Sequence, residues 1–302
     1  MRALRILGYT LAGLVGLLVV ALAVIYALSA RRMGRSYAAV RGHAVAVPTD
    51  PAAVLRGEKV ATVRGCTNCH TADAGGGVFI DVPPVAQLHA ANLTTGRGGV
   101  AARYAEPEDW ERAIRQGVAP DGRALLFMPA QEFYPMSDAD LGDLIAWLKA
   151  LPPVDREFGP QRVGPIGRVL LLTGKVPLLP AELVDHEAPR PAPVAPGVSV
   201  DYGRYLATNC TGCHGEGFAG GRIPGAPPEM QVPLNLTPDS ATGLGRWTQA
   251  DFDRALRTGV RPDGRRLGKD MPVAAFAHFT DDEVAALWLY LRSLPVRPFG
   301  SR

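Results

Sequence analysis

Two short segments of the chain combine two thiols and an imidazole at the same close spacing. Residues 66–70 read CTNCH and residues 210–214 read CTGCH. In a C-x-x-C-H segment the two thiols add to the vinyl groups of a porphyrin, and the histidine offers its imidazole to the iron. A zinc site or a thioredoxin-like motif does not require histidine directly after the second cysteine in both copies, and these segments contain all four cysteines. The sequence therefore predicts two covalently bound haem c groups, held by Cys66, Cys69, His70, Cys210, Cys213 and His214.

Each iron needs a second axial ligand, for which the sequence offers several thioether and imidazole side chains: Met128, Met136, Met230, Met271, His89 and His278. The two halves of the chain repeat one another, and both contain the pattern G-V-x-P-D-G. In this register Met128 aligns with Met271, and proline follows each of them, whereas Met136 aligns with Phe279. Thioether ligation favours ferrous iron, which suits electron transfer. We therefore expect Met128 and Met271 to bind the two irons.

Other repeated residues are candidates for the surroundings of the haems. A metal-bound imidazole usually donates its second N–H to a carbonyl, and two proline pairs follow the histidines at equal spacing: Pro83-Pro84 and Pro227-Pro228. Their carbonyls either accept this hydrogen bond or belong to ordinary loops. Arg123 and Arg265 either pair with haem propionates or remain solvated on the surface. Asn-x-Thr recurs at Asn92 and Asn235, which we interpret as a turn near the haem rather than a glycosylation acceptor.

Short helices are predicted to position these motifs. Asp50 followed by Pro51 is typical of an N-cap and a first helical residue, so a helix should run from there to the first motif. Residues 137–140 and 280–283 each have the S/T-x-x-D/E form of a capping box. The helices that they begin should end near Leu151 and Leu294, where proline follows. Small residues four positions apart before each motif should let another helix cross closely: Gly57 with Ala61, and Gly203 with Ala207.

The rest of the chain predicts a mainly α-helical protein with a rigid linker. No strand-like alternation of any length is present, so we expect helical domains. Residues 152–200 contain 10 prolines, which exclude a continuous helix. The apolar pieces of this segment favour a linker that packs against a domain over a flexible tether. The predicted division is an anchor with its flank (residues 1–41), domain 1 (42–151), a Pro-rich linker (152–197) and domain 2 (198–302).

The N-terminal segment has the composition of a membrane anchor. Residues 6–30 form an uncharged run of 25 residues, whereas about 20 suffice to span a bilayer. A signal-peptide apolar region is usually about 7–15 residues long, so an uncleaved anchor is favoured over a signal peptide cleaved near Ala27-Leu28-Ser29. The chain has net charge +3, but the first 41 residues contain six arginines and no acid. The remainder is mildly acidic, which gives no reason to expect a nucleic-acid partner.

The order of these elements resembles a class I cytochrome c domain, present twice. The Asn-Leu-Thr, Gly-Val-x-Pro-Asp-Gly and Met-Pro elements, with Trp247-Thr248, are similar to those of the multihaem cytochrome subunits of periplasmic alcohol and aldehyde dehydrogenases. The resemblance covers roughly residues 50–151 and 198–296, and differs in that those subunits typically carry three haems. It implies two tandem class I cytochrome c domains behind one transmembrane helix. It also implies that the helix containing Gly57 crosses the C-terminal helix near Trp147, and the helix containing Gly203 crosses near Tyr290.

The resemblance implies an electron carrier in the bacterial inner membrane. A single-pass anchor would leave the N-terminus in the cytoplasm and both haem domains in the periplasm, because this haem attachment occurs outside the cytoplasmic membrane. The partners would be redox proteins: a dehydrogenase, a quinol-oxidising complex, an oxidase or another cytochrome. Two alternatives are a diheme peroxidase-like enzyme with one displaceable axial methionine and a haem subunit of a larger oxidase. Catalytic residues are not predicted, since no nucleophile–base pair or phosphate loop is present in the sequence.

Overall fold

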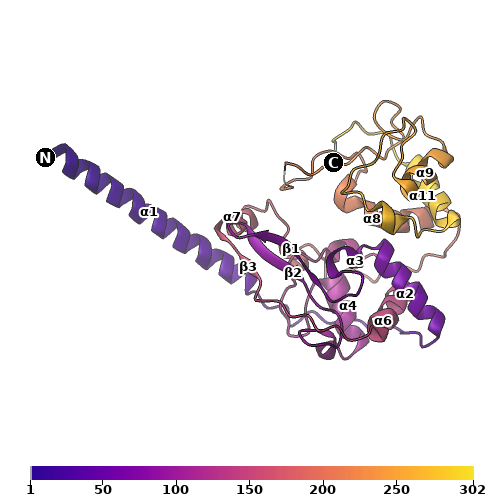
Figure 1. The fold of residues 1–302 in the computed structure, drawn as a ribbon, viewed down its shortest axis with the longest axis horizontal. Coiled ribbons are helices and arrows are strands. Elements are labelled where there is room, and N and C mark those ends of the chain that lie inside the picture. Colours follow the sequence, from indigo (N-terminus) through magenta and orange to yellow (C-terminus); the bar gives the residue numbers. More distant parts are fainter. Residues whose placement is uncertain (1, 227) are drawn as a thin grey trace.

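A computed structural model describes residues 2–226 and 228–302 as one long N-terminal helix and two small helical units (Figure 1). The elements before the second unit are α1 (Arg2–Met33), α2 (Pro51–Val63), α3 (Cys66–His70), β1 (Gly77–Val82), β2 (Ala86–Ala90), the 3₁₀ turn Ala101–Arg103, α4 (Pro107–Gln116), α5 (Ala130–Phe133), α6 (Asp138–Ala150), β3 (Arg162–Val163), α7 (Pro165–Leu172) and the 3₁₀ turn Pro180–Glu182. The second unit contains α8 (Val200–His214), α9 (Gln249–Thr258), α10 (Val273–Phe276) and α11 (Asp281–Ser293). The described chain is 44% helix and 7% strand, so the predicted mainly α class is confirmed.

Each unit is built on two helices that cross at a glycine, as the spacing of small residues predicts. In the first unit α2 crosses α6 at Gly57, where an added Cβ would overlap the carbonyl of Asp143 and lie 2.7 Å from Trp147 Cβ. In the second unit α8 crosses α11 at Gly203, where the Cβ would lie 2.8 Å from Tyr290 Cβ. Only the absence of a side chain permits this approach of the two backbones. The two crossings repeat one geometry at the expected residues.

The helix boundaries follow from local capping. The Asp50 side chain accepts from the Ala53 N–H at the start of α2, with proline at the first helical position. Thr280 and Glu283 form a reciprocal capping box at the start of α11. At the start of α6 the Ser137 side chain accepts from the Asp140 N–H. In a capping box the Asp140 side chain would accept from the Ser137 N–H in return, but this N–H bonds to a different side chain. The hydroxyl of Tyr205, from the second unit, accepts from the Ser137 N–H at 3.1 Å and donates to Asp140.

The expectation that strands are absent was wrong. Strands β1 and β2 form an antiparallel hairpin, and β3 from the linker pairs with β2 to give the order β1-β2-β3. The signal in the sequence is short, because β2 alternates buried and half-buried residues over five positions and β1 contains a bulge. Such segments are too brief for a reliable periodicity. The strand β3 owes its formation to pairing with β2, which the linker sequence does not encode locally.

The linker packs against the first unit, as its apolar pieces predict. Helix α7 begins at Pro165, after Gly164, and its Leu171 is fully buried. Leu171 shares a core with Leu88 of β2 and with Leu178 and Leu179 of the linker. Helix α7 also lies beside the C-terminal part of α1 (Figure 1), where the Arg168 side chain donates to Ser29 Oγ at 2.7 Å. The linker therefore connects the long helix with the sheet.

The helix crossings generate a stability prediction. Gly57→Ala should lower the free energy of unfolding by about 1–3 kcal/mol, because the added methyl group overlaps the α6 backbone. In an unobstructed helix interior the same substitution would stabilise by roughly 1 kcal/mol. Denaturant unfolding of the haem-loaded protein measures the sign, and Gly203→Ala tests the second crossing in the same way. Gly159→Ala is the control, since a Cβ there meets nothing within 4 Å; a more stable Gly57→Ala variant would contradict the prediction.

Candidate haem sites

The two C-x-x-C-H segments lie at the ends of matching helices but enter them differently. In the second unit α8 runs without interruption from Val200 to His214. In the first unit the chain leaves α2, passes through Gly65 at a φ of 77°, and forms the separate five-residue helix α3. A left-handed φ is easily reached by glycine and costly for most other residues. The position equivalent to Gly65 is Asn209, which remains helical, so the repeat is broken immediately before the motif.

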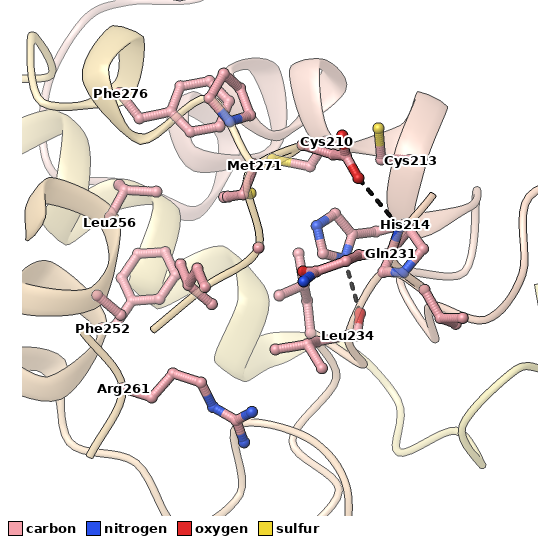
Figure 2. A pocket seen from close by; sticks show the side chains of 18 of the residues that line it. Cys210, Cys213, His214, Gln231, Leu234, Phe252, Leu256, Arg261, Met271 and Phe276 are labelled. Carbon is pink, nitrogen blue, oxygen red and sulfur yellow. Dashed lines mark hydrogen bonds between the residues drawn. The ribbon is translucent and has the colours of Figure 1, made fainter. Parts of the chain in front are cut away.

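A backbone carbonyl orients each motif histidine. The His70 Nδ1–H donates to the carbonyl of Ala91 at 2.8 Å, and the His214 Nδ1–H donates to the carbonyl of Leu234 at 2.7 Å (Figure 2). This bond assigns the proton to Nδ1 and leaves the lone pair of Nε2 available to a metal ion. Burial also lowers the pKa of both imidazoles. Each histidine is therefore held neutral and oriented, as an iron ligand requires.

The proline carbonyls do not have this role in the first unit. The Pro84 carbonyl accepts from the Ile166 N–H at 2.8 Å, so the proline pair joins the hairpin turn to α7. In the second unit the accepting carbonyl belongs to Leu234, and Pro227 lies outside the described residues. Of the two alternatives, the ordinary-loop interpretation therefore holds for Pro84. The carbonyls that do accept could not be singled out in the sequence, because a main-chain acceptor carries no side-chain signature. One indirect signal was present: both accepting residues directly precede the repeated Asn-Leu-Thr.

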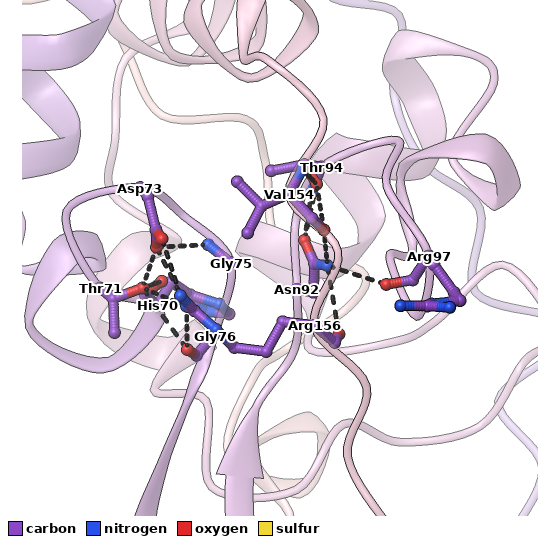
Figure 3. Close-up of polar contacts among 10 residues, drawn as sticks. All are labelled: His70, Thr71, Asp73, Gly75, Gly76, Asn92, Thr94, Arg97, Val154 and Arg156. Atoms are coloured by element: carbon purple, nitrogen blue, oxygen red, sulfur yellow. Dashed lines mark hydrogen bonds and ion pairs between the residues drawn. The ribbon is translucent and has the colours of Figure 1, made fainter.

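That repeated tripeptide is a buried turn, as the structural interpretation predicted. Asn92 accepts from the Thr94 N–H at 3.0 Å and donates to the carbonyl of Val154 at 2.7 Å (Figure 3). Asn235 makes the same bonds, to the Thr237 N–H at 2.9 Å and to the carbonyl of Arg297 at 2.9 Å. In each unit the turn therefore links two parts of the chain. One is the residue whose carbonyl orients the histidine, and the other is the segment that follows the last helix. The buried position of Asn92 and Asn235 leaves neither side chain available to a glycan.

The second unit contains an apolar cavity of about 210 Å³ bordered by the predicted site residues (Figure 2). Its lining includes Cys210, Cys213, His214 and Met271 with the apolar side chains Leu234, Leu236, Leu244, Trp247, Phe252, Leu256 and Phe276. Two thiols, an imidazole and a thioether thus lie around one largely apolar space. These residues fit a covalently attached haem, whose ring requires such a lining and whose iron takes nitrogen and sulfur ligands. In the first unit Cys66 and Met128 both pack at the edge of a single core.

The two Met-Pro loops have the same backbone. Pro129 and Pro272 have φ/ψ of −79°/64° and −80°/60°, and each precedes a one-turn helix, α5 or α10. Met128 and Met271 are half-buried beside the cores of their units. Met136 is fully buried in the first core, and its repeat partner Phe279 is buried in the second. Met128 and Met271 therefore occupy equivalent positions in the two units, whereas Met136 has no equivalent methionine in the second unit.

The arginines of the repeated turn do not line the cavity. The Arg265 Nη2–H donates to Asp263 at 2.6 Å and Arg123 pairs with Asp121 at 2.8 Å, with both arginine side chains largely exposed. The surface interpretation is therefore favoured over a propionate role. Arg261 lines the cavity instead, and its buried Nε–H has no hydrogen-bond partner among the described residues. Comparison of the two halves of the sequence did not single out Arg261, because alanine occupies the equivalent position 119. A cationic hydrogen-bond donor beside the cavity suits a haem carboxylate.

Burial controls the thiols of the attachment segments. It raises the pKa of Cys66 and of Cys210 to about 12. Cys69 and Cys213 are more exposed, and burial raises their pKa values as well. Both thiols of each segment are therefore protonated at neutral pH before attachment. Low-pKa, reactive thiolates, which metal or disulfide-exchange sites use, are not indicated.

Two helical units that each contain a C-x-x-C-H segment, with its histidine oriented by a main-chain carbonyl, are typical of a c-type cytochrome. The family profile described as "Cytochrome c" matches residues 54–152 and 200–295, and the chain belongs to this family. Cytochrome c domains bind haem c covalently, and the iron of that haem supplies one-electron transfer.

The chain is also similar to subunits of known dehydrogenases. It is 29% identical to the "Alcohol dehydrogenase (quinone), cytochrome c subunit" of Gluconobacter oxydans (strain 621H), over 86% of this chain and 58% of that protein. It is 35% identical to the "Fructose dehydrogenase cytochrome subunit" of Gluconobacter japonicus, over 45% and 28% of the two chains. A "Diheme cytochrome c-type" protein of Cereibacter sphaeroides is 39% identical over 20% of this chain and 21% of its own. The chain thus spans less than two thirds of the length of these relatives.

A partly buried carboxyl group beside the second motif generates a pH prediction. Glu132 of α5 lies against Gly212, where an added Cβ would meet Glu132 Oε2 at 2.7 Å. Burial, with the nearby Glu216, raises the pKa of Glu132 to about 7 from 4.5. The folded protein therefore holds this proton more tightly than the unfolded chain does. The protonated carboxyl group stabilises the fold fully below pH 4.5, and this stabilisation is lost as the pH rises to about 7. The loss should be about 3 kcal/mol.

Glu132→Gln should remove this dependence and make the haem-loaded protein more stable than wild type at pH 8. Thermal unfolding between pH 4 and 8 provides the measurement. The matched control is Glu187→Gln, which replaces an exposed carboxyl group and should leave the pH profile unchanged. Parallel pH profiles for wild type and Glu132→Gln would show that Glu132 titrates normally.

Proposed function

We propose that this protein is a periplasmic, membrane-tethered diheme cytochrome c that transfers electrons between a dehydrogenase or quinone-linked donor and a terminal acceptor. One haem would be attached at Cys66 and Cys69 with His70 and Met128 as axial ligands. The other would be attached at Cys210 and Cys213 with His214 and Met271. The domain division predicted from the sequence, with boundaries near residues 151 and 198, is part of this proposal. The dehydrogenase partner is inferred from the names of the relatives, which describe cytochrome subunits of alcohol and fructose dehydrogenases.

The observation that carries the proposal is the direct contact between the two haem-attachment segments. The Arg64 Nη1–H donates to Asn209 Oδ1 at 2.8 Å, and the Asn209 Nδ2–H donates to the carbonyl of Val63 at 3.1 Å. Arg64 lies two residues before Cys66, and Asn209 directly precedes Cys210. The chain segments that would bear the two porphyrins therefore touch. Such an arrangement supports electron transfer between the haems.

Further contacts fix the two units against each other. Val63 of α2 packs into the core of the second unit. Lys59 forms an ion pair with Glu283 at 2.6 Å, and the Tyr205 hydroxyl bonds to the start of α6. Because both polar contacts involve partly buried side chains, they are less screened than surface pairs. A fixed arrangement of the units favours a carrier whose haems exchange electrons without domain motion.

The peroxidase-like alternative requires one iron with an open or displaceable sixth position. The matching backbone of the two Met-Pro loops supports methionine ligation in both units and therefore opposes this alternative. A haem subunit of a larger oxidase would also carry electrons, and it differs from the main proposal in its fixed partner. The electron-carrier function is the one that the site supports best.

Helix α1 supports the proposed anchor. It is long and apolar enough to cross a membrane, a test that signal sequences also pass. The helix continues past the candidate cleavage site, and Ser29 at that site is fully buried against α7. Arg32 donates to the carbonyl of Leu171 at 2.6 Å and pairs with Glu182. Arg32 would remain after such a cleavage, but Tyr26 and Ser29, which both contact Arg168, would be removed. A segment removed during export would not be expected to form part of the fold, so the contacts of Tyr26 and Ser29 favour an uncleaved anchor with the haem units in the periplasm.

The ligand set generates a spectroscopic prediction that tests the carrier function. The wild-type protein should contain two covalent haems per chain, both low-spin in the ferric state, with the weak long-wavelength band of methionine-to-iron ligation. Met128→Ala and Met271→Ala should each remove about half of this band. Each variant should also lower the potential of one haem, since loss of the thioether removes a ligand that favours ferrous iron.

Met136→Ala is the matched control, because Met136 is buried in the core near the first site and is not a proposed ligand. It should retain the full band, although cavity formation should lower stability by about 2–5 kcal/mol. If the wild-type protein has one high-spin haem and turns over peroxide rapidly, it is a peroxidase-like enzyme and not an electron carrier. Loss of the band in Met136→Ala but not in Met128→Ala would reassign the first ligand.

The anchor generates a separate prediction. The native protein should remain in the inner membrane after washing at high salt and at alkaline pH, and its mass should include residues 1–30. The reason is the uncharged helical segment, whose length exceeds the roughly 20 residues that span a bilayer. Membrane fractionation with mass spectrometry of the intact protein provides the measurement. A soluble periplasmic protein that begins near Ala30 would instead identify residues 1–29 as a signal peptide.

A further inference from the structure

A short apolar surface beside the end of α1 has no function in the haem sites. It consists of Val82, Pro83 and Pro84 in the β1–β2 turn and of Pro165, Ile166 and Val169 on α7, all exposed. We call these six residues the hairpin–α7 surface. Its two parts are joined, since the Ile166 N–H donates to the carbonyl of Pro84 and the Gly164 N–H donates to that of Val85 at 2.9 Å. Contiguous exposed apolar side chains of this kind usually mark an interaction site.

The position of α7 along α1 indicates what covers this surface. The Arg168 guanidinium lies 4.3 Å from the centre of the Tyr26 ring and donates to Ser29 Oγ at 2.7 Å. Both partners belong to the last turns of the uncharged run that ends at residue 30. A helix that contacts α1 at this level lies beside the part of α1 that would emerge from the bilayer. Figure 1 shows α7 and the hairpin beside the C-terminal end of α1.

The charges around the surface suit lipid headgroups. Residues 163–181 contain no acid, and their two charged residues are Arg168 and Lys175. The acid that follows them, Glu182, is paired with Arg32 at 2.6 Å. Arg31 and Arg35 follow the uncharged run, and no acid occurs before Asp50. The nearest carboxylate on the hairpin, Asp81, accepts from the Gln87 side chain at 2.9 Å. Apolar side chains bordered by basic ones are typical of segments that lie in the membrane interface, and Arg168 can keep its charged end at the headgroups.

We propose that the hairpin–α7 surface lies in the outer interface of the bilayer and forms a second membrane contact beside the transmembrane helix. This inference rests on the proposed anchor. Its consequence is orientation: one helix alone would leave the first unit free to tilt relative to the bilayer plane, whereas two contacts fix which face is directed toward the membrane. Because β2 ends directly before Ala91, whose carbonyl orients His70, the contact also fixes the direction of the first haem site.

The experiment uses the full-length, haem-loaded protein in phospholipid nanodiscs with photoreactive p-benzoylphenylalanine at single positions. Ile166 and Val169 are the test positions, with exposed fractions of 50% and 40%. The matched controls in the second unit are Val296 and Leu289, with exposed fractions of 63% and 41%. Leu18 within α1 reports on the anchor itself. Lipid adducts are identified by mass spectrometry after illumination, and haem content verifies folding of each variant.

Lipid adducts at positions 166 and 169, several-fold more abundant than at 289 and 296, would support the membrane contact. Adducts at position 18 without adducts at 166 and 169 would overturn the contact while leaving the anchor in place. The absence of adducts at position 18 would instead remove the anchor and this inference with it. The same illumination in native membranes tests whether a protein partner, and not lipid, contacts this surface. Protein adducts in place of lipid adducts at positions 166 and 169 would identify a subunit interface and overturn the proposal.

Discussion

The hydrogen bond from a histidine Nδ1–H to one main-chain carbonyl is the interaction on which each unit depends. This bond sets the direction of the imidazole, and the rest of the unit fixes the positions of the histidine and of the carbonyl. In the second unit His214 ends the helix that approaches its neighbour at Gly203, and in the first unit His70 belongs to α3, which follows the helix that contains Gly57. The carbonyl precedes an asparagine whose amide is bonded to the chain leaving the final helix. The helix crossing and the buried turn therefore form one closed arrangement around the imidazole.

The two units are alike in this arrangement and differ where they meet other parts of the protein. Gly65 interrupts the first attachment helix, and its counterpart Asn209 bonds across the interface to Arg64 and Val63. Arg261 lines the second cavity, where the first unit has Ala119. The Arg261 guanidinium lies 3.3 Å from the Asp263 carboxylate, so an ion pair borders the second cavity. The departures from the repeat thus give the two haem sites different electrostatic surroundings and a direct connection.

Much of the fold was predictable because it depends on local rules. The Asp50 cap, the capping box at Thr280, and the crossings at Gly57 and Gly203 follow from side-chain types at fixed spacing. The attachment segments and the Met-Pro loops were recognisable for the same reason. The carbonyl that orients each histidine was not, since any residue has one, and neither was strand β3, which forms by pairing with a distant segment. Alignment of the two halves also failed to identify Arg261, because it finds only residues that both halves contain, and the first half has Ala119 at this position.

The sheet gives the first unit a connection to the proposed membrane helix that the described residues of the second unit do not have. Helix α1 bonds to α7 through Arg32 and Arg168, and α7 directly follows β3, which pairs with β2. Strand β2 leads into Ala91, whose carbonyl holds His70. Each step in this series is a main-chain pairing, a covalent connection or a partly buried polar contact. Helix α1 and the first attachment segment therefore belong to one continuous structure, and the second attachment segment is joined to it through Arg64 and Asn209.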